Sequence, residues 1–426
     1  MTSNVYIRCF LLLLGLAVLS GCATFSDQFK PVEKQLVKGQ YPAALEALEK
    51  IKGPDRDQVL YHMNRGMILR MDGQYEASNA AFEEAKKIAE PLQAVSITEQ
   101  AGAVSVNDTM RSYAGEDFEL VFLHAYKALN YLELNEPDSA RIEAMQIDVR
   151  MQEIKDNYFH EDGFARYLMG MIFEALEEED DALIAYRHAY EAYKNLQDKF
   201  RVPVPVSLKK DLLRLTYKLG FDNEHDKLRA EFSDVKWSKE DSHKGKGELI
   251  VLFNNNLAPK KREKVIQSVA SGKFVRIALP YYISRPLRAT HMTVNSGNHE
   301  VKGEMVENLD AIAKSTLQDQ IPMITARTIA RAVVKNQTAS KVGDKNPLVG
   351  LLLNILGAAS ESADTRSWVT LPHNIHLARL SLEPGEYDFD VGVYNGSSAA
   401  VDKRRFENVR IRSGEKVFRT FHWISN

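Results

Sequence analysis

Thiols are almost missing from this chain of 426 residues. The only two cysteines, Cys9 and Cys22, lie close to its start. A disulfide framework is therefore excluded from the remainder, as is a zinc or iron–sulfur site built on thiolates. A large excess of charge of one sign is also lacking, because 55 basic and 58 acidic residues give a formal net charge of −3. No overall attraction to nucleic acid or to an anionic surface follows, and we predict no nucleic-acid partner.

Motifs of the common enzyme classes are absent too. The sequence holds no GxSxG elbow, P-loop or HExxH, and no GxGxxG after a strand. Its 11 histidines are scattered without the paired spacing of a metal site. Glu116 and Asp117 are adjacent, and adjacent side chains of one helix point apart. We interpret these two carboxylates as capping residues before Phe118 and not as an acid–base pair.

One further group of polar residues could be assembled into an active site. Its members are Asp364, Arg366, Trp368, His373 and His376. We interpret Asp364 and Arg366 as a structural ion pair at a domain joint, and Trp368 as a core or interface residue. The sequence therefore predicts no catalytic residues, no metal and no cofactor, and a protein that is not an enzyme.

The first residues have the pattern of a secretory signal. Arg8 supplies a positive charge, and an apolar run over residues 9–19 follows it. That run is shorter than the roughly 20 residues that span a bilayer as a helix. The next residues, Leu19-Ser20-Gly21-Cys22, resemble the lipobox of bacterial lipoproteins. The resemblance implies diacylglyceryl transfer to the Cys22 thiol, cleavage after Gly21 and acylation of the new amino terminus. The alternative is an uncleaved anchor helix with a chance cysteine.

Acylation of Cys22 would attach the mature protein to a membrane through fatty-acyl chains such as palmitate. One such chain binds marginally, whereas two or more anchor a protein durably. The second mature residue is Ala23 and not the aspartate that retains lipoproteins at the inner membrane. By analogy with that sorting rule we expect the periplasmic side of the outer membrane. No apolar segment of 18 residues follows Cys22, so no second span is predicted.

An internal repeat marks the amino-terminal half. Residues 39–44 (GQYPAA) recur as residues 73–78 (GQYEAS), a shift of 34 residues that is typical of tetratricopeptide repeats. Gly66 stands where the first helix of a pair needs a small residue, Phe82 and Ala85 follow at the expected spacing, and Pro91 closes the unit. An insertion over residues 91–117 separates this unit from the next.

Looser units follow this clear repeat. Matching positions predict a third pair of helices with a turn at 135–138, a fourth with a turn near 177–180, and a degenerate pair over 208–219 and 223–232. Such pairs stack into a curved solenoid. The first helices line its inner surface, which we predict to be a groove for a peptide or helix of a partner. The predicted groove residues are Asn64, Met67, Arg70, Met71, Phe122, Tyr126, Tyr167 and Met171.

Two readings of the groove residues stay open. Adaptable methionines beside aromatic anchors suit a binding groove, and Asn64 with Arg70 could hold a carboxylate. Alternatively, half of these side chains pack between repeats and bind nothing.

A change of period marks the carboxyl-terminal half. Residues 234–247 are polar and predict a linker. Beyond it, the pattern predicts strands at 248–253 and 273–279, a hairpin of 292–294 with 300–302, and a helix over 309–336 bent near Pro322. Four alternating strands end the chain at 375–380, 385–394, 406–411 and 417–423. The basic residues at 260–264 are interpreted as a solvated face.

The apolar residues 347–359 are too few to cross a membrane. They predict a buried helix, with a membrane-dipping or partner-binding helix as the alternative. The fold class is thus an α-solenoid of tetratricopeptide-like repeats followed by a β-rich α+β domain with a long helix. The predicted divisions are a signal peptide (1–21), a lipidated tether (22–32), repeats (33–233), a linker (234–247) and the β-rich domain (248–426).

Three stretches resemble a family of bacterial outer-membrane lipoproteins with tetratricopeptide repeats and no established activity. They are residues 113–119 (YAGEDFE), 257–261 (LAPKK) and 363–368 (ADTRSW). The resemblance implies a role in the cell envelope, since the genes of such lipoproteins often lie near genes for lipoproteins that activate cell-wall synthases. Other envelope proteins, the cell-wall synthesis machinery among them, are therefore the implied partners. It implies no catalytic residues.

Two functions remain open from the sequence. The leading hypothesis is a protein-binding scaffold that faces the periplasm. The alternative is a hydrolase or transferase that acts on envelope polymers through the carboxyl-terminal domain.

Overall fold

The computed structural model describes residues 25–51, 53–99, 108–154, 161–238, 245–270, 273–297, 299–343, 349–351, 354, 357, 361–397 and 399–425. The predicted signal peptide, with Cys9 in it, and the predicted acylation site Cys22 lie outside these residues. Within the described ranges, no helix is both long and apolar enough to cross a bilayer.

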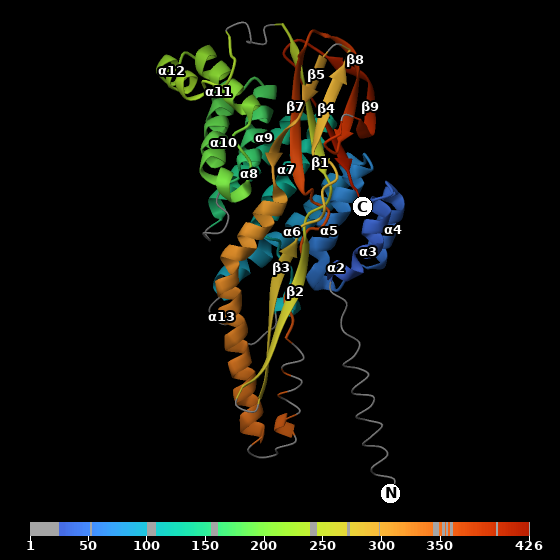
Figure 1. Ribbon diagram of the computed structural model, residues 1–426, viewed down its shortest axis with the longest axis vertical. Coiled ribbons are helices and arrows are strands. Elements are labelled where there is room, and N and C mark those ends of the chain that lie inside the picture. The colour runs from blue at the N-terminus through green and yellow to red at the C-terminus, as the bar shows by residue number, and fades with distance from the viewer. Residues whose placement is uncertain are drawn as a thin grey trace.

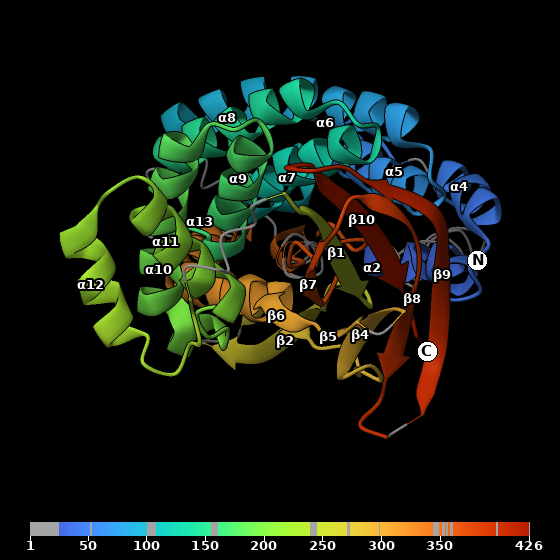
Figure 2. The ribbon, with the colours of Figure 1, turned by 90° about the horizontal axis from the view of Figure 1, so that it is seen from above.

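Pairs of helices make up the first half of the described chain, after the short helix α2 (Phe25–Gln28). They are α3 (Lys30–Leu36) with α4 (Tyr41–Lys50), α5 (Gln58–Met71) with α6 (Tyr75–Glu99), α7 (Asp117–Glu133) with α8 (Pro137–Glu153), α9 (Gly163–Ala175) with α10 (Glu179–Phe200), and α11 (Val206–Lys218) with α12 (Asp222–Glu231). Figure 2 shows the pairs stacked along an arc. The predicted helical repeats are confirmed.

Glycines allow the two helices of a pair to approach each other. A Cβ atom at Gly66 would lie 2.6 Å from the ring of Phe82, and one at Gly170 would lie 2.3 Å from the ring of Tyr186. Both distances are far below van der Waals contact, so neither site accepts a larger residue without a shift. The predicted need for a small residue at Gly66 is confirmed, and Gly170 plays the same part in the fourth pair.

The recurring Gly-Gln sequence marks the turns at which one helix ends. Gly39 and Gly73 have φ values of +67° and +77°, in the left-handed region that favours glycine. The N–H group of Gly73 donates to the carbonyl of Arg70, and that of Gly39 to the carbonyl of Leu36. These bonds satisfy carbonyls that a helix end leaves without a partner.

One boundary in this half was predicted wrongly. Helix α6 does not stop at Pro91 but continues to Glu99. A proline inside a helix removes one N–H donor and usually breaks the helix. Here the chain resumes the helical ladder beyond it, so the first part of the expected insertion belongs to α6.

Strands dominate the second half. Sheet A has the order β10-β1-β7-β6, sheet C has the order β5-β4-β8-β9, and β2 pairs with β3 alone. Their bounds are β1 (Gly247–Asn255), β2 (Lys260–Ala270), β3 (Lys273–Ile283), β4 (His291–Ser296), β5 (His299–Lys302), β6 (Glu304–Glu307), β7 (Asn374–Leu382), β8 (Gly385–Tyr394), β9 (Ala400–Ile411) and β10 (Lys416–Trp423). Strands were predicted at six of these places and in the hairpin.

Sheet A is the middle layer of the molecule. Strand β1 presents Ile250 and Leu252 to the core shared with the helices, and Leu249 and Val251 to the core shared with sheet C. All four are completely buried or nearly so. Figure 2 shows β1, β7 and β10 inside the arc of helices. The concave side of the solenoid is therefore filled by the chain's own sheet.

Three elements in this half differ from the sequence-based predictions, one of which is β6 (Glu304–Glu307), where no strand was predicted. Residues 260–264, interpreted as a solvated face, begin strand β2, which pairs with β3 over its whole length from Lys260 to Ala270. The hydrophobic pattern did not reveal this strand, because it begins with five charged residues and its apolar residues are few. Helix α13 (Leu309–Gly343) passes through Pro322 as one helix and is longer than predicted.

Helix α13 and the β2–β3 hairpin project from the body side by side, as Figure 1 shows. Residues of the 349–361 segment pack beside α13, since the Asn354 amide donates to Asn336 over 2.6 Å. We call the β2–β3 hairpin, α13 and the described residues of 349–361 the stalk.

Replacing Gly170 by alanine tests the close packing of the fourth pair. The new Cβ would collide with Tyr186, and overpacking of this kind costs about 1–3 kcal/mol. We expect the denaturation midpoint in urea to fall accordingly. The matched control is Gln197→Ala on the exposed side of α10, which should leave the midpoint unchanged. Equal midpoints for both variants would contradict the packing argument.

Candidate functional site

The predicted groove residues are buried and not open to solvent. Seven of the eight are at most 2% exposed, and Met71 is partly buried. They line the inner side of the solenoid, where sheet A and the segment before β7 cover them. The seven are Asn64, Met67, Arg70, Phe122, Tyr126, Tyr167 and Met171. The prediction of an open partner-binding groove is therefore wrong, because the chain's own second half occupies it.

Polar groove residues bind this second half directly. The Asn64 amide oxygen accepts from the backbone N–H of Thr370 over 3.2 Å and from its hydroxyl over 3.0 Å. The Tyr126 hydroxyl donates to Asn254 over 2.7 Å. Arg70 donates to Asn130 and, over 2.6 Å, to Thr420. Asn64 and Arg70 thus have different partners within the chain, and they do not form the suggested carboxylate site.

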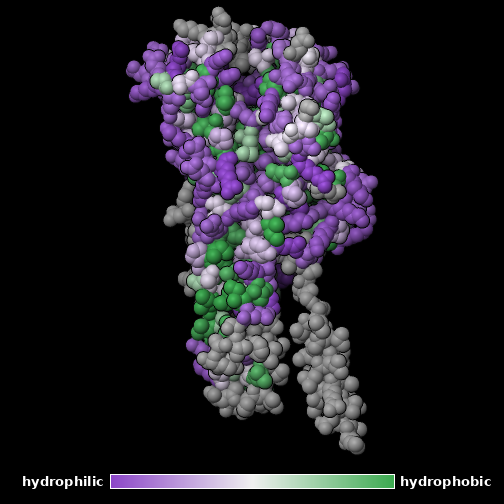
Figure 3. Space-filling view, in the orientation of Figure 1, coloured by the Kyte–Doolittle hydropathy of each residue, from purple (hydrophilic) through white to green (hydrophobic). Residues whose placement is uncertain are grey.

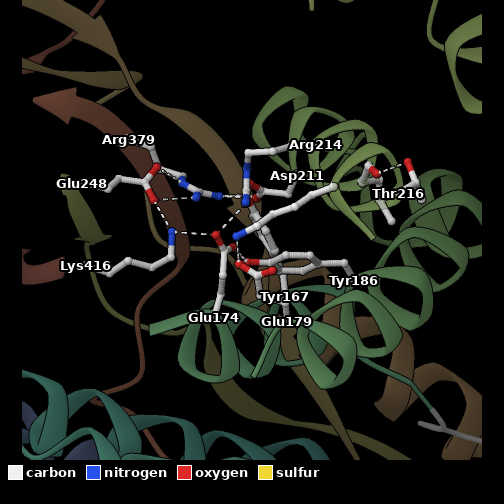
Figure 4. A network of polar contacts seen from close by, with 12 residues as sticks. Tyr167, Glu174, Glu179, Tyr186, Asp211, Arg214, Thr216, Glu248, Arg379 and Lys416 are labelled. Atoms are coloured by element: carbon white, nitrogen blue, oxygen red, sulfur yellow. Dashed lines mark hydrogen bonds and ion pairs between the residues drawn. The ribbon is translucent and has the colours of Figure 1, made fainter. Parts of the chain in front are cut away.

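Six charged side chains form a closed ring between the solenoid and sheet A (Figure 4). Lys416 Nζ lies 3.0 Å from Glu174 and 2.7 Å from Glu248. Arg379 pairs with Glu248 at 2.7 Å and also with Asp211. Arg214 closes the ring at 2.7 Å from Glu174 and 2.9 Å from Asp211. Three come from α9 and α11 and three from β1, β7 and β10: Glu174, Asp211 and Arg214, and Glu248, Arg379 and Lys416.

This ring is electrically neutral and nearly dry. Its side chains are only 4–9% exposed, so each charge would cost several kcal/mol to bury without a partner. Burial raises the pKa of Glu174, but Lys416, Arg214 and Arg379 outweigh it and hold that pKa well below its usual range. Without the sheet, the buried charges on α9 and α11 would lose their partners of opposite charge. The ring therefore holds the two halves in one relative position.

A second junction brings together the three stretches that carry the family resemblance. Glu119 accepts from the backbone N–H of Trp368 over 2.7 Å and from the Tyr113 hydroxyl over 2.5 Å. Glu116 pairs with Lys261 at 3.0 Å. The pairs of Glu119 with Trp368 and of Glu116 with Lys261 each join two different stretches. The pair of Glu119 with Tyr113 joins the two ends of one stretch. We take this motif junction as the candidate functional site.

Glu119 is the titratable centre of the motif junction. Burial, and then the nearby charge of Glu116, raise the pKa of Glu119 to about 7. A neighbour in the chain supplies a hydrogen bond to the Glu119 carboxyl group. Glu116 is the N-cap of α7, and the Glu119 side chain accepts from the Glu116 backbone N–H in a capping box. The predicted capping role of Glu116 is confirmed.

Glu116 also connects the solenoid to the base of the stalk. One of its carboxylate oxygens lies 3.0 Å from Lys261 on β2, and the other accepts from Gln320 on α13 over 3.2 Å. Lys261 is 4% exposed, and the nearby Tyr282 and Glu116 raise its pKa against the opposing effect of burial. A lysine with a raised pKa stays protonated, so it is a poor nucleophile and a lasting partner for a carboxylate.

Arg366 has the structural role that the sequence predicted. Its guanidinium binds Asp364 in a two-pronged pair at 2.9 and 2.6 Å, and it also lies 2.8 Å from Asp57. The same group lies 5.3 Å from the ring centroid of Tyr113. Trp368 is 1% exposed, which confirms it as a core residue. These contacts tie the 363–368 stretch to the start of α5 and to the 113–119 stretch.

The two histidines of the possible active site face other neighbours. His373 Nε2 lies 3.7 Å from Asp310 at the start of α13. His376 lies on β7, opposite Phe253 and Met305, and burial lowers its pKa to about 4. In the part of the chain that the structure describes, no group of three or more potential ligands could hold a metal ion. The motif junction thus offers positioning and charge pairing, and its groups are engaged with one another.

Sequence reasoning missed a pair of buried carboxyl groups, Asp162 and Glu307. Asp162 caps α9 by accepting from the backbone N–H of Ala165 over 2.6 Å, and its carboxyl group interacts electrostatically with that of Glu307 at the end of β6. Burial raises the pKa of Asp162 to about 6 and that of Glu307 well above its usual range. An aspartate before a helix was a readable signal. Its partner Glu307 could not be predicted in this way, since Glu307 lies far from Asp162 along the chain.

The Glu307→Gln variant tests this pair through the pH dependence of stability. The folded pair binds protons that the unfolded chain releases, so its stabilising contribution is present at low pH and is lost as pH rises through 6 and beyond. Glutamine keeps a donor and removes one titration. We expect a weaker loss of stability with pH, by up to about 1.4 kcal/mol per pH unit.

The measurement is urea denaturation between pH 5 and pH 8, with wild type and variant side by side. Glu386→Gln on the exposed start of β8 is the matched control. Parallel pH profiles for wild type and Glu307→Gln would refute the raised pKa of Glu307.

Comparisons with known proteins add little to this geometry. No family model and no curated protein matches the chain. Among solved structures, it is similar to MamA (12% identity, 47% of this chain and 91% of that one, TM-score 0.31) and to MamA from Desulfovibrio magneticus RS-1 (13%, 49% and 92%, 0.31). It is also similar to a Podosopora anserina kinesin light chain with nearly identical TPR-like repeats (12%, 49% and 92%, TM-score 0.32). The chain's own helix pairs therefore remain the basis for assigning repeats.

Proposed function

We propose that this chain is a lipoprotein held at the periplasmic side of the outer membrane by acyl chains on Cys22. There it acts as a protein-binding scaffold in the assembly or maintenance of the cell envelope, and it catalyses no reaction. The lipobox residues 19–22 support the anchor. The engaged groups of the motif junction support a positioning role, so we do not propose the hydrolase or transferase.

A surface on the outside of the solenoid carries the scaffold proposal. Ile142, Met145 and Val149 of α8 are 59%, 47% and 44% exposed. Their spacing of three and four residues places them on one face of the helix. Figure 2 shows α8 on the convex side of the arc. A row of exposed apolar side chains is a contact site of the kind that a partner's helix or groove covers.

This outer row takes the place of the predicted inner groove. Helices α7 and α9 bury their inner sides against sheet A, whereas α8 keeps its apolar row exposed. A polar rim adjoins the row, since Arg141 pairs with Glu178 at 2.7 Å. Apolar centres with polar rims are the usual anatomy of protein interfaces. The proposed partner is an envelope protein, with the cell-wall synthesis machinery as the first candidate.

Photo-crosslinking in cells tests the outer row. A photoreactive residue at Met145 should give a discrete adduct with an envelope protein, and Ile142→Asp on the same face should reduce that adduct about tenfold or more, as loss of an interface centre does. The control places the same photoreactive residue at Val401, which is equally exposed on β9. Adducts of equal pattern at both positions, or none at Met145, would overturn the proposal.

Replacing Cys22 by alanine tests the anchor. Without the thiol no diacylglyceryl group can be attached, so palmitate labelling should vanish and the protein should no longer be held in the outer-membrane fraction through acyl chains. Cys9→Ala is the matched control, because this residue lies within the predicted signal peptide and its loss should leave labelling intact. Wild-type protein without label would show the anchor to be absent.

A further inference from the structure

We propose that the outer part of the stalk lies against a phospholipid membrane and buries apolar side chains at the boundary between headgroups and acyl chains. This inference rests on the proposed anchor at Cys22 for its geometry. It goes further by assigning a second, non-covalent membrane contact to residues of the body.

Exposed apolar side chains gather on the outer part of the stalk. Figure 3 shows this patch on the lower part of the molecule. Its members are between 38% and 50% exposed, and they come from β2, from α13 and from the segment after α13. They are Val265 and Ile266, Ile329, Val333 and Val334, and Val349 and Leu351. We call these seven residues the stalk patch.

The hairpin shows how open this region is. Successive side chains of a strand point to opposite faces, yet Val265 and Ile266 are 38% and 49% exposed. Neither face of β2 is therefore fully covered at this point by the residues that the structure describes. On α13, Ile329 and Val333 are one turn apart and share a face. The segment predicted as a buried helix adds to the patch, since Leu351 is 50% exposed.

Charge on the outer stalk suits an anionic lipid surface. Residues 263–276 hold three basic side chains and one acidic one, Glu263, which pairs with Arg276 at 3.0 Å, and residues 323–361 hold five basic and two acidic ones. One of those acids, Glu361, is 2% exposed and is paired with Lys335. The whole chain has a formal net charge of −3, whereas these two segments carry a local excess of positive charge. Basic residues beside exposed apolar ones are typical of surfaces that lie in a membrane interface.

The base of the stalk is tied to the start of the mature chain. Asp27 of α2 pairs with Arg262 of β2 at 3.0 Å, and Glu33 of α3 pairs with Lys260 at 2.7 Å. Only Ala23 and Thr24 lie between Cys22 and Phe25, the first residue of α2, so the three steps of chain from Cys22 to Phe25 span at most about 10 Å. From Arg262 to the end of β2 at Ala270 the strand extends about 26 Å, at roughly 3.3 Å per residue.

This difference in length carries the inference. In Figure 1 the stalk projects past α2, on the side of the body where α2 lies. Acyl chains on Cys22 reach a bilayer only within about 10 Å of α2, whereas the stalk reaches about 26 Å beyond the same level. With the stalk directed at the membrane that holds Cys22, its outer part lies on the bilayer or enters its interface. Lipid is the occupant of the stalk patch that these lengths and charges favour over a second copy of the chain.

A single fluorescent label tests the contact. Apart from Cys9 and Cys22 the chain holds no cysteine, so the acylated mature protein with Val333→Cys can be labelled at one site with an environment-sensitive dye. The protein is placed in vesicles of phosphatidylethanolamine and phosphatidylglycerol. We expect a blue shift and roughly twofold brighter emission relative to detergent-free protein without vesicles, because the dye leaves water for the acyl-chain boundary. Val401→Cys on β9, 46% exposed, is the matched control and should show no shift.

Each result decides one way. A shift at position 333 alone, produced by vesicles, supports the inference. No shift at 333, or an equal shift at 401, overturns it. A shift that grows with protein concentration before vesicles are added also overturns it, and assigns the stalk patch to a second copy. The mass of the purified protein reports acylation separately. Protein without acyl chains would refute the proposed anchor at Cys22, while the dye would still report whether the stalk binds added vesicles.

Discussion

The ring of six alternating charges between the solenoid and sheet A is the interaction on which the remaining architecture depends. Each member is almost fully buried, and its charge is tolerable only beside its two neighbours. Half of the ring belongs to helices and half to strands that lie more than 30 residues further along the chain. Neither half of the protein is electrostatically complete alone, so the solenoid and the sheet form one body.

Filling of the solenoid by sheet A changes what the repeats can do. A free solenoid of helix pairs offers its concave side to partners. Here that side is the internal core, with Asn64, Tyr126 and Tyr167 bonded to the second half of the chain. Among the described residues, the convex row on α8 and the outer stalk expose apolar side chains. We propose the first as a contact for a protein and the second as a contact for lipid.

The motif junction links these two surfaces. Glu119 and Glu116 sit at the start of α7, whose partner in the repeat is α8, and Glu116 holds both β2 and α13 at the base of the stalk. These contacts hold the base of the stalk against the start of α7. In the proposed setting, a partner bound to α8 would be presented at a defined position relative to the membrane. The three stretches with family resemblance thus have a mechanical explanation that needs no chemistry.

The sequence by itself determined the local features. The period of 34 residues, the small residue at Gly66 and the alternating strands at the end of the chain predicted the elements, because each depends on neighbours close in sequence. The ion pair of Asp364 with Arg366 was predictable for the same reason. Only the tertiary structure decided that the inner groove is filled, that Asp162 meets Glu307, and that three distant stretches converge. Such contacts join residues separated by more than a hundred positions, and a pattern read along one chain holds no distance between them. Strand β2 was missed because its polar residues pair with β3 through backbone hydrogen bonds, which leave little trace in hydrophobic periodicity.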